Sequence, residues 1–305
     1  MPHISTNFAD DLDPTLQVMW NSGYPTRPSM IPMIFNDEPN NGRNIMEFSQ
    51  NGALPDWQLF EGETIEAEIA QGYKTTMTAL EFAQGMSVQR KLEDDQQYST
   101  FMTRPKQMRE SEWRTREKYG ARIFNMGFSD DSFFYENAEG VALFSTAHTT
   151  RASNVSTAIG FSNKTTGALS SVSVNTMYVL AREFRGDIGN IIDCRPDTLL
   201  IPDNLHERAM EIENSQLNPK DANNAENVWK GTKVWEWQYL RDNSTTNFFY
   251  LDSTMIKTFL HWWDRIPAEF RSAREFNTMV ALFAGYARYA NCWTDWRFGV
   301  GAEVS

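Results

Sequence analysis

The first forty residues are rich in both proline and large apolar side chains, and this combination restricts the fold more than any other feature of the chain. Half of the twelve prolines lie in this segment: Pro2, Pro14, Pro25, Pro28, Pro32 and Pro39. Proline fixes φ and lacks a backbone donor, so the segment holds neither a long helix nor a central strand. Because large apolar residues nevertheless recur from Phe8 to Phe35, it needs a surface to lie on. We expect an arm that crosses onto a neighbouring copy and packs partly on its own core.

Composition indicates a folded, acidic protein. A length of 305 residues suffices for one large domain or two smaller ones. Hydrophobic residues make up 41% of the chain and aromatic residues 13%, which excludes a disordered chain. The net charge of −12 argues against a protein that seeks DNA or anionic lipid as a whole. An equally simple reading is that the acidity keeps a concentrated protein soluble.

The sequence predicts synthesis in a reducing compartment and no membrane span. Its two cysteines, Cys194 and Cys292, are far apart and form no metal-binding pattern. The opening residues lack the basic and apolar regions of a signal peptide. The longest apolar run, Met279–Ala287, is far shorter than the roughly 20 residues that cross a bilayer.

We predict that the protein is not an enzyme. His148 lies near Ser145, but no G-x-S-x-G turn or orienting acid accompanies them, so a hydrogen-bonded structural histidine is expected. Phosphate-binding glycine motifs are also missing from the sequence. We predict no cofactor and no metal site, because the histidines are dispersed and the acidic run Glu93–Asp95 is explained by a helix N-terminus.

Two extended elements are predicted after the arm. Residues 56–90 are typical of a long β-hairpin, with period-two alternation at 80–83 and 86–89 and glycines at turn or bulge positions. Two strands alone are marginal in water, so the hairpin either packs on its own domain or covers a partner. A charged helix follows within 96–128, with Pro105 at its first position, Gly127 at its end, and Tyr119, Ile123 and Met126 on its buried face.

The remaining chain reads as short mixed elements. We predict a strand at 141–144, a surface loop at 151–168, a helix at 172–184, a buried strand at 198–201, a helix at 204–215 and a loop at 216–226. Val172, Thr176, Val179 and Leu180 are expected on the buried face of the first helix. Segments 234–239 and 248–251 are expected to pair as strands, and 274–290 is expected to be a strand.

Tryptophans are concentrated in the last third of the chain. They are Trp229, Trp235, Trp237, Trp262, Trp263, Trp293 and Trp296. Such clusters fill cores and interfaces more often than they line ligand clefts. The alternative is a soluble, β-rich carbohydrate- or ligand-binding protein that uses this cluster.

Three sequence blocks, in their order and spacing, resemble a known family. They are EFAQGMSVQRKLEDD at residues 81–95, ALFSTAH at 142–148 and PDTLLIP at 196–202. With the charged helix between them, they resemble the major capsid proteins of tailed bacteriophages, and in particular the Mu-type major head subunit. The resemblance extends from about Leu54 to Gly299 and implies an α+β fold of the HK97 capsid type.

The resemblance implies a division into four parts. Residues 1–50 correspond to the N-terminal arm and 51–90 to the extended hairpin, or E-loop. Residues 91–190 and 259–305 correspond to the peripheral domain, whose long helix is the spine, and 191–258 to the axial domain. The implied function is self-assembly into the hexamers and pentamers of an icosahedral head that encloses double-stranded DNA. An acidic inner surface would then avoid binding the packaged DNA tightly.

The resemblance also implies partners and contact residues. We expect a separate scaffolding protein, or a chain in its mature form, because the ~100-residue helical leader of some relatives is missing. A portal, a decoration protein and weak non-specific contact with packaged DNA are further expectations, with synthesis in the bacterial cytoplasm and residence in the virion shell. Lys74 lies in the hairpin where some relatives form a lysine–asparagine bond, but we do not predict that bond here. The expected inter-subunit contact residues are Trp20, Tyr24, Trp57, Phe60, Lys74, Arg109, Trp113 and Arg116.

Overall fold

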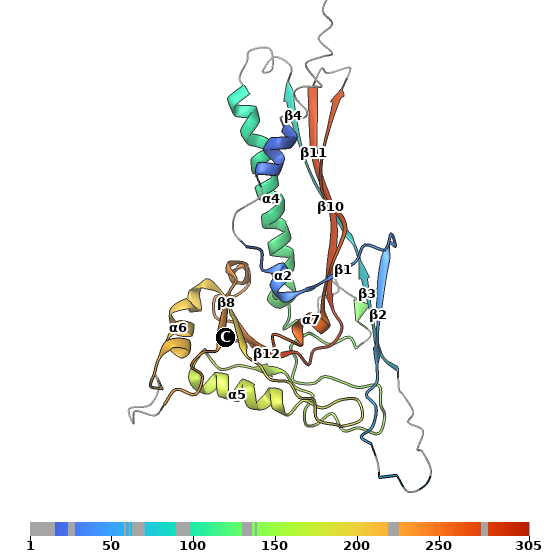
Figure 1. The fold of residues 1–305 in the computed structure, drawn as a ribbon, viewed down its shortest axis with the longest axis vertical. Coiled ribbons are helices and arrows are strands. Elements are labelled where there is room, and N and C mark those ends of the chain that lie inside the picture. Colours follow the sequence, from blue (N-terminus) through green and yellow to red (C-terminus); the bar gives the residue numbers. More distant parts are fainter. Residues whose placement is uncertain are drawn as a thin grey trace, which may run out of the picture.

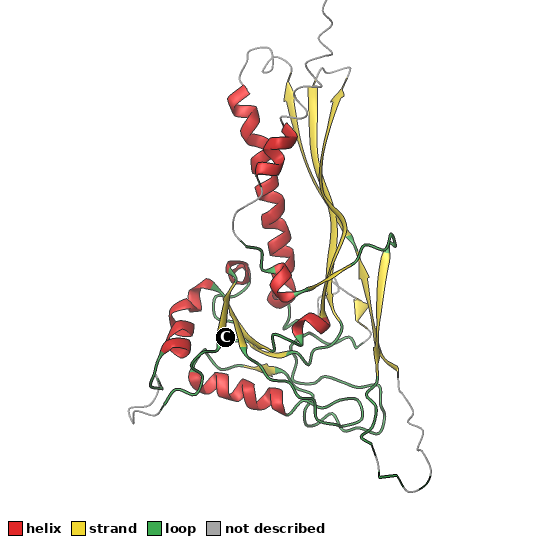
Figure 2. Ribbon diagram, viewed as in Figure 1, coloured by secondary structure: helices red, strands yellow, loops and turns green. Residues whose placement is uncertain are grey.

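The protein is an upright limb on a broader base (Figure 1). This computed structural model describes residues 16–23, 28–57, 59–60, 62, 71–89, 98–129, 136–137, 139–218, 226–275 and 280–304. In the limb, the longest helix and the longest strands run beside one another (Figure 1). Shorter helices and strands, joined by long loops, make up the base (Figure 2).

Helices and strands alternate along the chain as an α+β fold. The helices are α2 (Ile31–Ile34), α4 (Tyr98–Asn125), α5 (Ser171–Arg182), α6 (His206–Asn214) and α7 (Ile256–Phe259), with 3-10 turns η1 (Asp203–Leu205) and η2 (Gln238–Asp242). The strands are β1 (Asn36–Glu38), β2 (Ile45–Asn51), β3 (Gln71–Thr78), β4 (Leu80–Gln89), β5 (Glu136–Asn137), β6 (Lys164–Thr165), β7 (Thr198–Ile201), β8 (Lys233–Glu236), β9 (Phe248–Leu251), β10 (Leu260–Glu275), β11 (Val280–Trp293) and β12 (Gly299–Ala302).

A four-stranded sheet of order β1-β10-β11-β4 forms one side of the limb. Strand β11 confirms the predicted strand over 280–290, because Ala281, Phe283 and Ala287 are buried while Leu282 and Ala284 between them are exposed. The start of that prediction is wrong, because residues 274–275 end the separate strand β10. Buried and exposed residues alternate because successive side chains of a strand point to opposite faces. Ala281 and Phe283 belong to one apolar cluster with Met108 of α4, which runs beside this sheet (Figure 1). Residues 276–279, which were included in that prediction, lie outside the described residues.

The predicted hairpin over 56–90 is wrong in its pairing. Strand β3 pairs antiparallel with β2, whereas β4 pairs antiparallel with β11 in an unbroken register from Leu80↔Tyr289 to Gln89↔Val280. The chain leaves one sheet at Ala79, which is buried, and enters the other. Period-two alternation identifies a strand but not its partner, and the partner of β4 lies some two hundred residues away in sequence. The hairpin that projects from the body is β2–β3.

The base contains a five-stranded mixed sheet of order β6-β12-β9-β7-β8. The buried strand at 198–201 is confirmed as β7, whose four residues are all buried. The expected pairing of 234–239 with 248–251 is wrong. Strand β8 pairs in parallel with one edge of β7, and β9 pairs antiparallel with the opposite edge of β7. The buried apolar strand β7 lies between them, and η2 turns the chain before β9 begins.

This sheet also joins segments that were expected to belong to different domains. Strands β6 and β12, expected in the peripheral domain, pair with each other, and β12 pairs with β9, which was expected in the axial domain. Helix α5, also expected in the peripheral domain, packs on β12 and β9. The C-terminal residues of the chain are therefore part of the base.

The helix predictions are right in position and partly wrong in detail. Helix α4 begins at Tyr98, so Pro105 lies inside it. The Pro105 residue is buried, and this packing offsets the lost backbone hydrogen bond. The helix ends at Asn125 near Gly127 as predicted, but Met126 lies beyond the last turn and is exposed, while Tyr119 and Ile123 are buried.

Three further predictions concern the base. Helix α5 buries Val174, Met177 and Ala181 instead of the predicted face, and Val172 and Val179 are exposed. The residues of both helix faces have helical spacing, so the spacing alone does not show which face is buried. The face that packs on the sheet is the one with Val174, Met177 and Ala181. The helix at 204–215 is confirmed by α6, with Ala209 and Ile212 buried. The expected strand at 141–144 is wrong: this segment is irregular, although Phe144 is buried and its N–H donates to Gly127 O at 2.7 Å.

Two apolar clusters stabilise the molecule. The large cluster extends from the base into the lower limb and includes Leu200, Phe249 and Trp263. The small one lies at the far end of the limb and contains Leu16, Trp20, Val88, Met108, Phe270, Ala281 and Phe283. Through Leu16 and Trp20, the helical residues 16–22 pack on their own chain.

Truncating a buried side chain in the interior strand β7 of the base should destabilise the subunit. Leu200→Ala removes a fully buried side chain from β7, and we expect a loss of about 2–5 kcal/mol in the free energy of unfolding. Val228, which is 84% exposed, provides the control: Val228→Ala should change stability by less than about 0.5 kcal/mol. Urea unfolding followed by tryptophan fluorescence measures both, and equal losses would contradict the assigned core.

Candidate assembly surfaces

A buried carboxylate on α4 joins three parts of the molecule. Glu117 is 1% exposed and accepts hydrogen bonds from Trp237 Nε1 at 2.9 Å, from Met30 N at 3.4 Å and from the Ser29 hydroxyl. Ser29 and Met30 precede α2, and Trp237 directly follows β8. Burial raises the pKa of Glu117, and the three hydrogen bonds oppose that shift. The carboxylate therefore fixes the arm and the base to the long helix.

Arg116, the neighbouring residue on α4, binds the long sheet. Its Nη2 lies 2.5 Å from Asp264 Oδ2 on β10. Its guanidinium carbon lies 4.9 Å from the ring centroid of Trp262 and 5.8 Å from that of Tyr289. Stacking of a cation on aromatic rings and pairing with a carboxylate together hold α4 against β10 and β11.

His148 is a structural residue, as predicted. It is buried, its ring stacks on Trp296 at 4.1 Å between centroids, and its Nδ1 lies 3.1 Å from Glu139 Oε1. Its Nε2 lies 3.0 Å from Asn163 Oδ1, which also accepts from Ser145 N. Both ring nitrogens lie within hydrogen-bond distance of side-chain oxygens, so the site anchors the segment around residue 148 to the core.

Most of the tryptophan cluster is core. Trp237, Trp262, Trp263, Trp293 and Trp296 are all buried, which confirms the core part of that prediction. Trp229 and Trp235 are partly buried against the same cluster. Rings this deeply packed do not form the walls of an open ligand cleft.

The end of the β2–β3 hairpin exposes large apolar side chains. Leu54 is 60% exposed, Trp57 101%, Leu59 86% and Phe60 70%. Monomeric soluble proteins rarely group such residues on one exposed loop, and a contiguous apolar surface marks an interaction site. This group, Leu54, Trp57, Leu59 and Phe60, is called the hairpin tip below.

The residues expected at subunit contacts fall into two groups. Trp57 and Phe60 belong to the exposed hairpin tip. Five others contact their own chain. Trp20 stacks on Phe270 at 5.2 Å between ring centroids, and Trp113 lies edge-on to Tyr239 at 6.4 Å. Lys74 pairs with Glu47 at 2.7 Å, Arg116 binds Asp264, and Arg109 lies 5.2 Å from the Trp20 ring and 3.2 Å from Glu112. Tyr24 lies outside the described residues.

Sequence reasoning missed Glu117, although a signal was present. Glu117, Ala121 and Phe124 follow the i, i+4, i+7 spacing of one helix face, and Ala121 and Phe124 are both buried. An acidic residue in register with a buried stripe requires donors from the elements packed on it.

The described residues contain no candidate metal centre and no membrane span. Within the described ranges, no group of three His, Cys, Asp or Glu side chains is placed to hold a metal ion. Glu93–Asp95 lies outside them. Among the helices of the same part of the chain, none is long and apolar enough to cross a bilayer. Cys194 and Cys292 are buried and free.

Solved structures share this architecture at low sequence identity. The capsid of the native GTA particle is 13% identical, with a TM-score of 0.54 and 92% of each chain covered. The procapsid of bacteriophage JBD30 is 12% identical, with a TM-score of 0.51, and covers 99% of this chain and 77% of that one. The capsid of Ralstonia phage GP4 is 9% identical, with a TM-score of 0.53, and covers 88% and 85%. The fold is therefore the expected α+β capsid fold of the HK97 type.

The sequence itself identifies the family. A family model described as phage capsid protein matches residues 72–302, which is most of the chain. No curated protein matches the sequence. The chain belongs to the phage capsid protein family and is a major capsid protein of a phage head shell.

Removing the Glu117 carboxylate should loosen the joint between arm, helix and base. Glu117→Ala leaves the Trp237 and Met30 N–H groups without their acceptor, so we expect a loss of about 1–3 kcal/mol in the free energy of unfolding at neutral pH. Glu110→Ala, an exposed position of the same helix, should cost less than about 0.5 kcal/mol. Urea unfolding of the unassembled subunit measures both, and equal costs would contradict the role of Glu117.

The same carboxylate should give stability a defined pH dependence. Because the folded pKa of Glu117 lies above its ordinary value of 4.5, the folded state binds the proton more tightly. Protonated Glu117 therefore stabilises the folded state increasingly as the pH falls from above its folded pKa toward 4.5. This stabilisation is lost as the pH rises through the folded pKa. The difference in unfolding free energy between the wild type and Glu117→Gln should follow this trend. A difference that is constant, or that grows with rising pH, contradicts it.

Proposed function

We propose that this major capsid protein assembles into the hexamers and pentamers of an icosahedral head that encloses double-stranded DNA. The observation that carries the proposal is the exposed hairpin tip, which projects on β2–β3 away from the limb (Figure 1). Burying an aromatic or leucine side chain contributes about 1.5–3 kcal/mol, so four such residues favour association strongly. Several modest contacts on each subunit then act together in a closed shell.

We assign the parts of the chain by their sheets. The arm comprises residues 1–44, and the E-loop hairpin runs from β2 through β3, residues 45–78. The peripheral domain comprises α4 with β10, β11 and β4, and strand β1 of the arm adds to the edge of its sheet. The axial domain comprises the five-stranded sheet with α5 and α6, so it includes the C-terminal strand β12. Sheet membership supports this division.

The assembly has further partners in this proposal. A separate scaffolding protein directs the curvature, a portal occupies one vertex and a decoration protein covers the outer surface. Basic and acidic side chains are interspersed along α4, and the chain is acidic overall. Contact with packaged DNA is therefore weak and non-specific. Synthesis takes place in the bacterial cytoplasm, and the role of the protein is structural, with no catalytic step. The order of the sequence blocks favours a relationship with the Mu-type head subunit.

Particle formation tests the proposal. The expressed chain, alone and with a scaffolding protein, should form particles or capsomers of at least several hundred kilodaltons, visible by negative-stain microscopy and size exclusion. Replacing residues 53–69 with a short glycine-serine linker should abolish particles while preserving the circular dichroism of the subunit, because the replacement removes the hairpin tip and no residue of the two described core clusters. A wild-type chain that stays a monomer or dimer with its scaffold would overturn the proposal.

A further inference from the structure

The two strands of the β2–β3 hairpin change register just before the chain leaves for the hairpin tip. The pairs Ser49↔Lys74 and Asn51↔Gln71 enclose one residue of β2 and two residues of β3. Two residues opposite one form a β-bulge, which bends the strand and re-aims the residues that follow it. The direction in which the hairpin tip leaves the body therefore depends on this bulge.

Gln50, the single residue on the β2 side, joins the bulge to the body. Its Oε1 accepts a hydrogen bond from Tyr73 N at 3.3 Å, which satisfies a backbone donor where the ladder is interrupted. Its Nε2 donates to the backbone oxygen of Thr294, which directly follows β11. One amide therefore holds the bulge with its oxygen and the body with its nitrogen.

The two residues on the β3 side are also adapted to this arrangement. A methyl group at Gly72 would lie only 2.6 Å from Gln50 Cβ, so glycine is what allows Gln50 to come this close. Gly72 O accepts from Arg151 Nη1 at 3.1 Å, and the Tyr73 hydroxyl lies 2.7 Å from Thr149 Oγ1. The bulge is thus bound to the body from both strands.

A cavity of about 330 Å³ lies beside the bulge. It is lined by Phe48 and Gln50 of β2, by His261 of β10 and by Thr294. The Phe48 ring stacks on His261 at 4.2 Å between centroids. The root of the hairpin therefore has open space on this side, and the bond from Gln50 to Thr294 crosses from the hairpin to the opposite wall.

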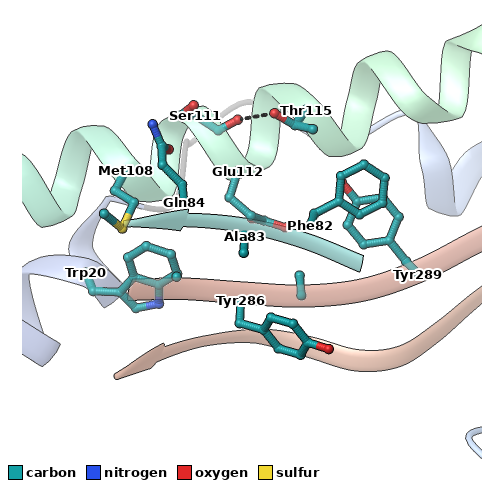
Figure 3. Close-up of a pocket in the computed structure, with 12 residues that line it drawn as sticks. Trp20, Phe82, Ala83, Gln84, Met108, Ser111, Glu112, Thr115, Tyr286 and Tyr289 are labelled. Carbon is teal, nitrogen blue, oxygen red and sulfur yellow. Dashed lines mark hydrogen bonds between the residues drawn. The ribbon is translucent and has the colours of Figure 1, made fainter. Parts of the chain in front are cut away.

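A cavity of similar size in the limb is bordered by elements that are fixed to one another. It has a volume of about 320 Å³ and lies between Met108 and Glu112 of α4 and Tyr286 of β11 (Figure 3). Arg116 binds Asp264 across the same two layers. Space next to a projecting element is found instead beside the bulge.

We propose that Gln50 is a positioning residue that fixes the direction of the hairpin tip by holding the β2–β3 bulge on Thr294. When this bond is broken, the root turns toward the cavity and the tip takes several directions. The proposal rests on the proposed function, in which the tip is a contact surface. A contact surface that is already held in one direction loses less conformational freedom when copies associate.

An isosteric substitution separates this bond from packing. Gln50→Glu keeps the size of the side chain and the acceptor for Tyr73 N, but it places a second carboxylate oxygen against Thr294 O, where no donor remains. Gln71→Glu is the matched control, because it adds the same charge at an exposed position of the same hairpin.

Pulsed electron paramagnetic resonance on the unassembled full-length subunit measures the direction of the tip. Spin labels at Asp56→Cys, in the tip region, and Val179→Cys, on α5, are both at exposed positions, and the two native cysteines are buried. The labelled wild type and Gln71→Glu should give one narrow distance distribution. Gln50→Glu should widen the distribution at least twofold, and Gly72→Ala should widen it as well, because its methyl group displaces Gln50.

The outcomes separate the positioning role from stability and from the proposed function. Equal widths in the wild type and Gln50→Glu, or equal widening in Gln71→Glu, overturn the positioning role. A lower urea midpoint of Gln50→Glu with an unchanged width makes Gln50 a stability residue only and overturns it too. If Gln50→Glu does not fold, Gln50→Ala takes its place with the same expectations.

Particle yield connects the position of the tip with assembly. Gln50→Glu should lower the yield of particles at least fivefold, whereas Gln71→Glu should assemble like the wild type. A wild type that never assembles rejects the proposed function, and the distances in the unassembled subunit then still decide the role of Gln50.

Discussion

The apolar hairpin tip is a surface that the chain cannot bury by itself, and the rest of the molecule is consistent with that constraint. Four large side chains project on two strands away from every cluster of the core. Their burial is worth several kcal/mol, comparable to the whole stability of many domains. In the proposed assembly, this energy is gained when a neighbouring copy covers the tip.

A subunit that contributes an exposed contact needs a rigid body to present it. Helix α4 supplies this body because its buried face is fixed on several sides: Glu117 binds the residues before α2 and Trp237, and Arg116 binds Asp264 and stacks on Trp262. His148 performs a similar task in the base, where it joins Glu139 and Asn163 on top of Trp296. These polar groups sit inside an apolar core and are satisfied there, which specifies one arrangement of limb and base.

Local pattern predicted the elements well, whereas their partners required three-dimensional information. The alternation of β11 and the four buried residues of β7 follow from side-chain periodicity and were found where expected. The end of α4 near Gly127 was also found as expected, but the helix begins at Tyr98, ahead of the predicted Pro105. The pairing of β4 with β11, and of β8 with β7 instead of β9, depends on strands that are distant in sequence. The Glu117 joint was missed for the same reason, since two of its three donors precede α2 and the third follows β8.

The central claim is that neighbouring copies cover the hairpin tip. A cryo-electron microscopy map of assembled particles, at a resolution that shows aromatic side chains, tests it most directly. The account predicts that density for Leu54, Trp57, Leu59 and Phe60 of every subunit lies against another subunit, with the limb and base unchanged. Particles in which these residues project into solvent, with the contacts between subunits made elsewhere, would contradict it.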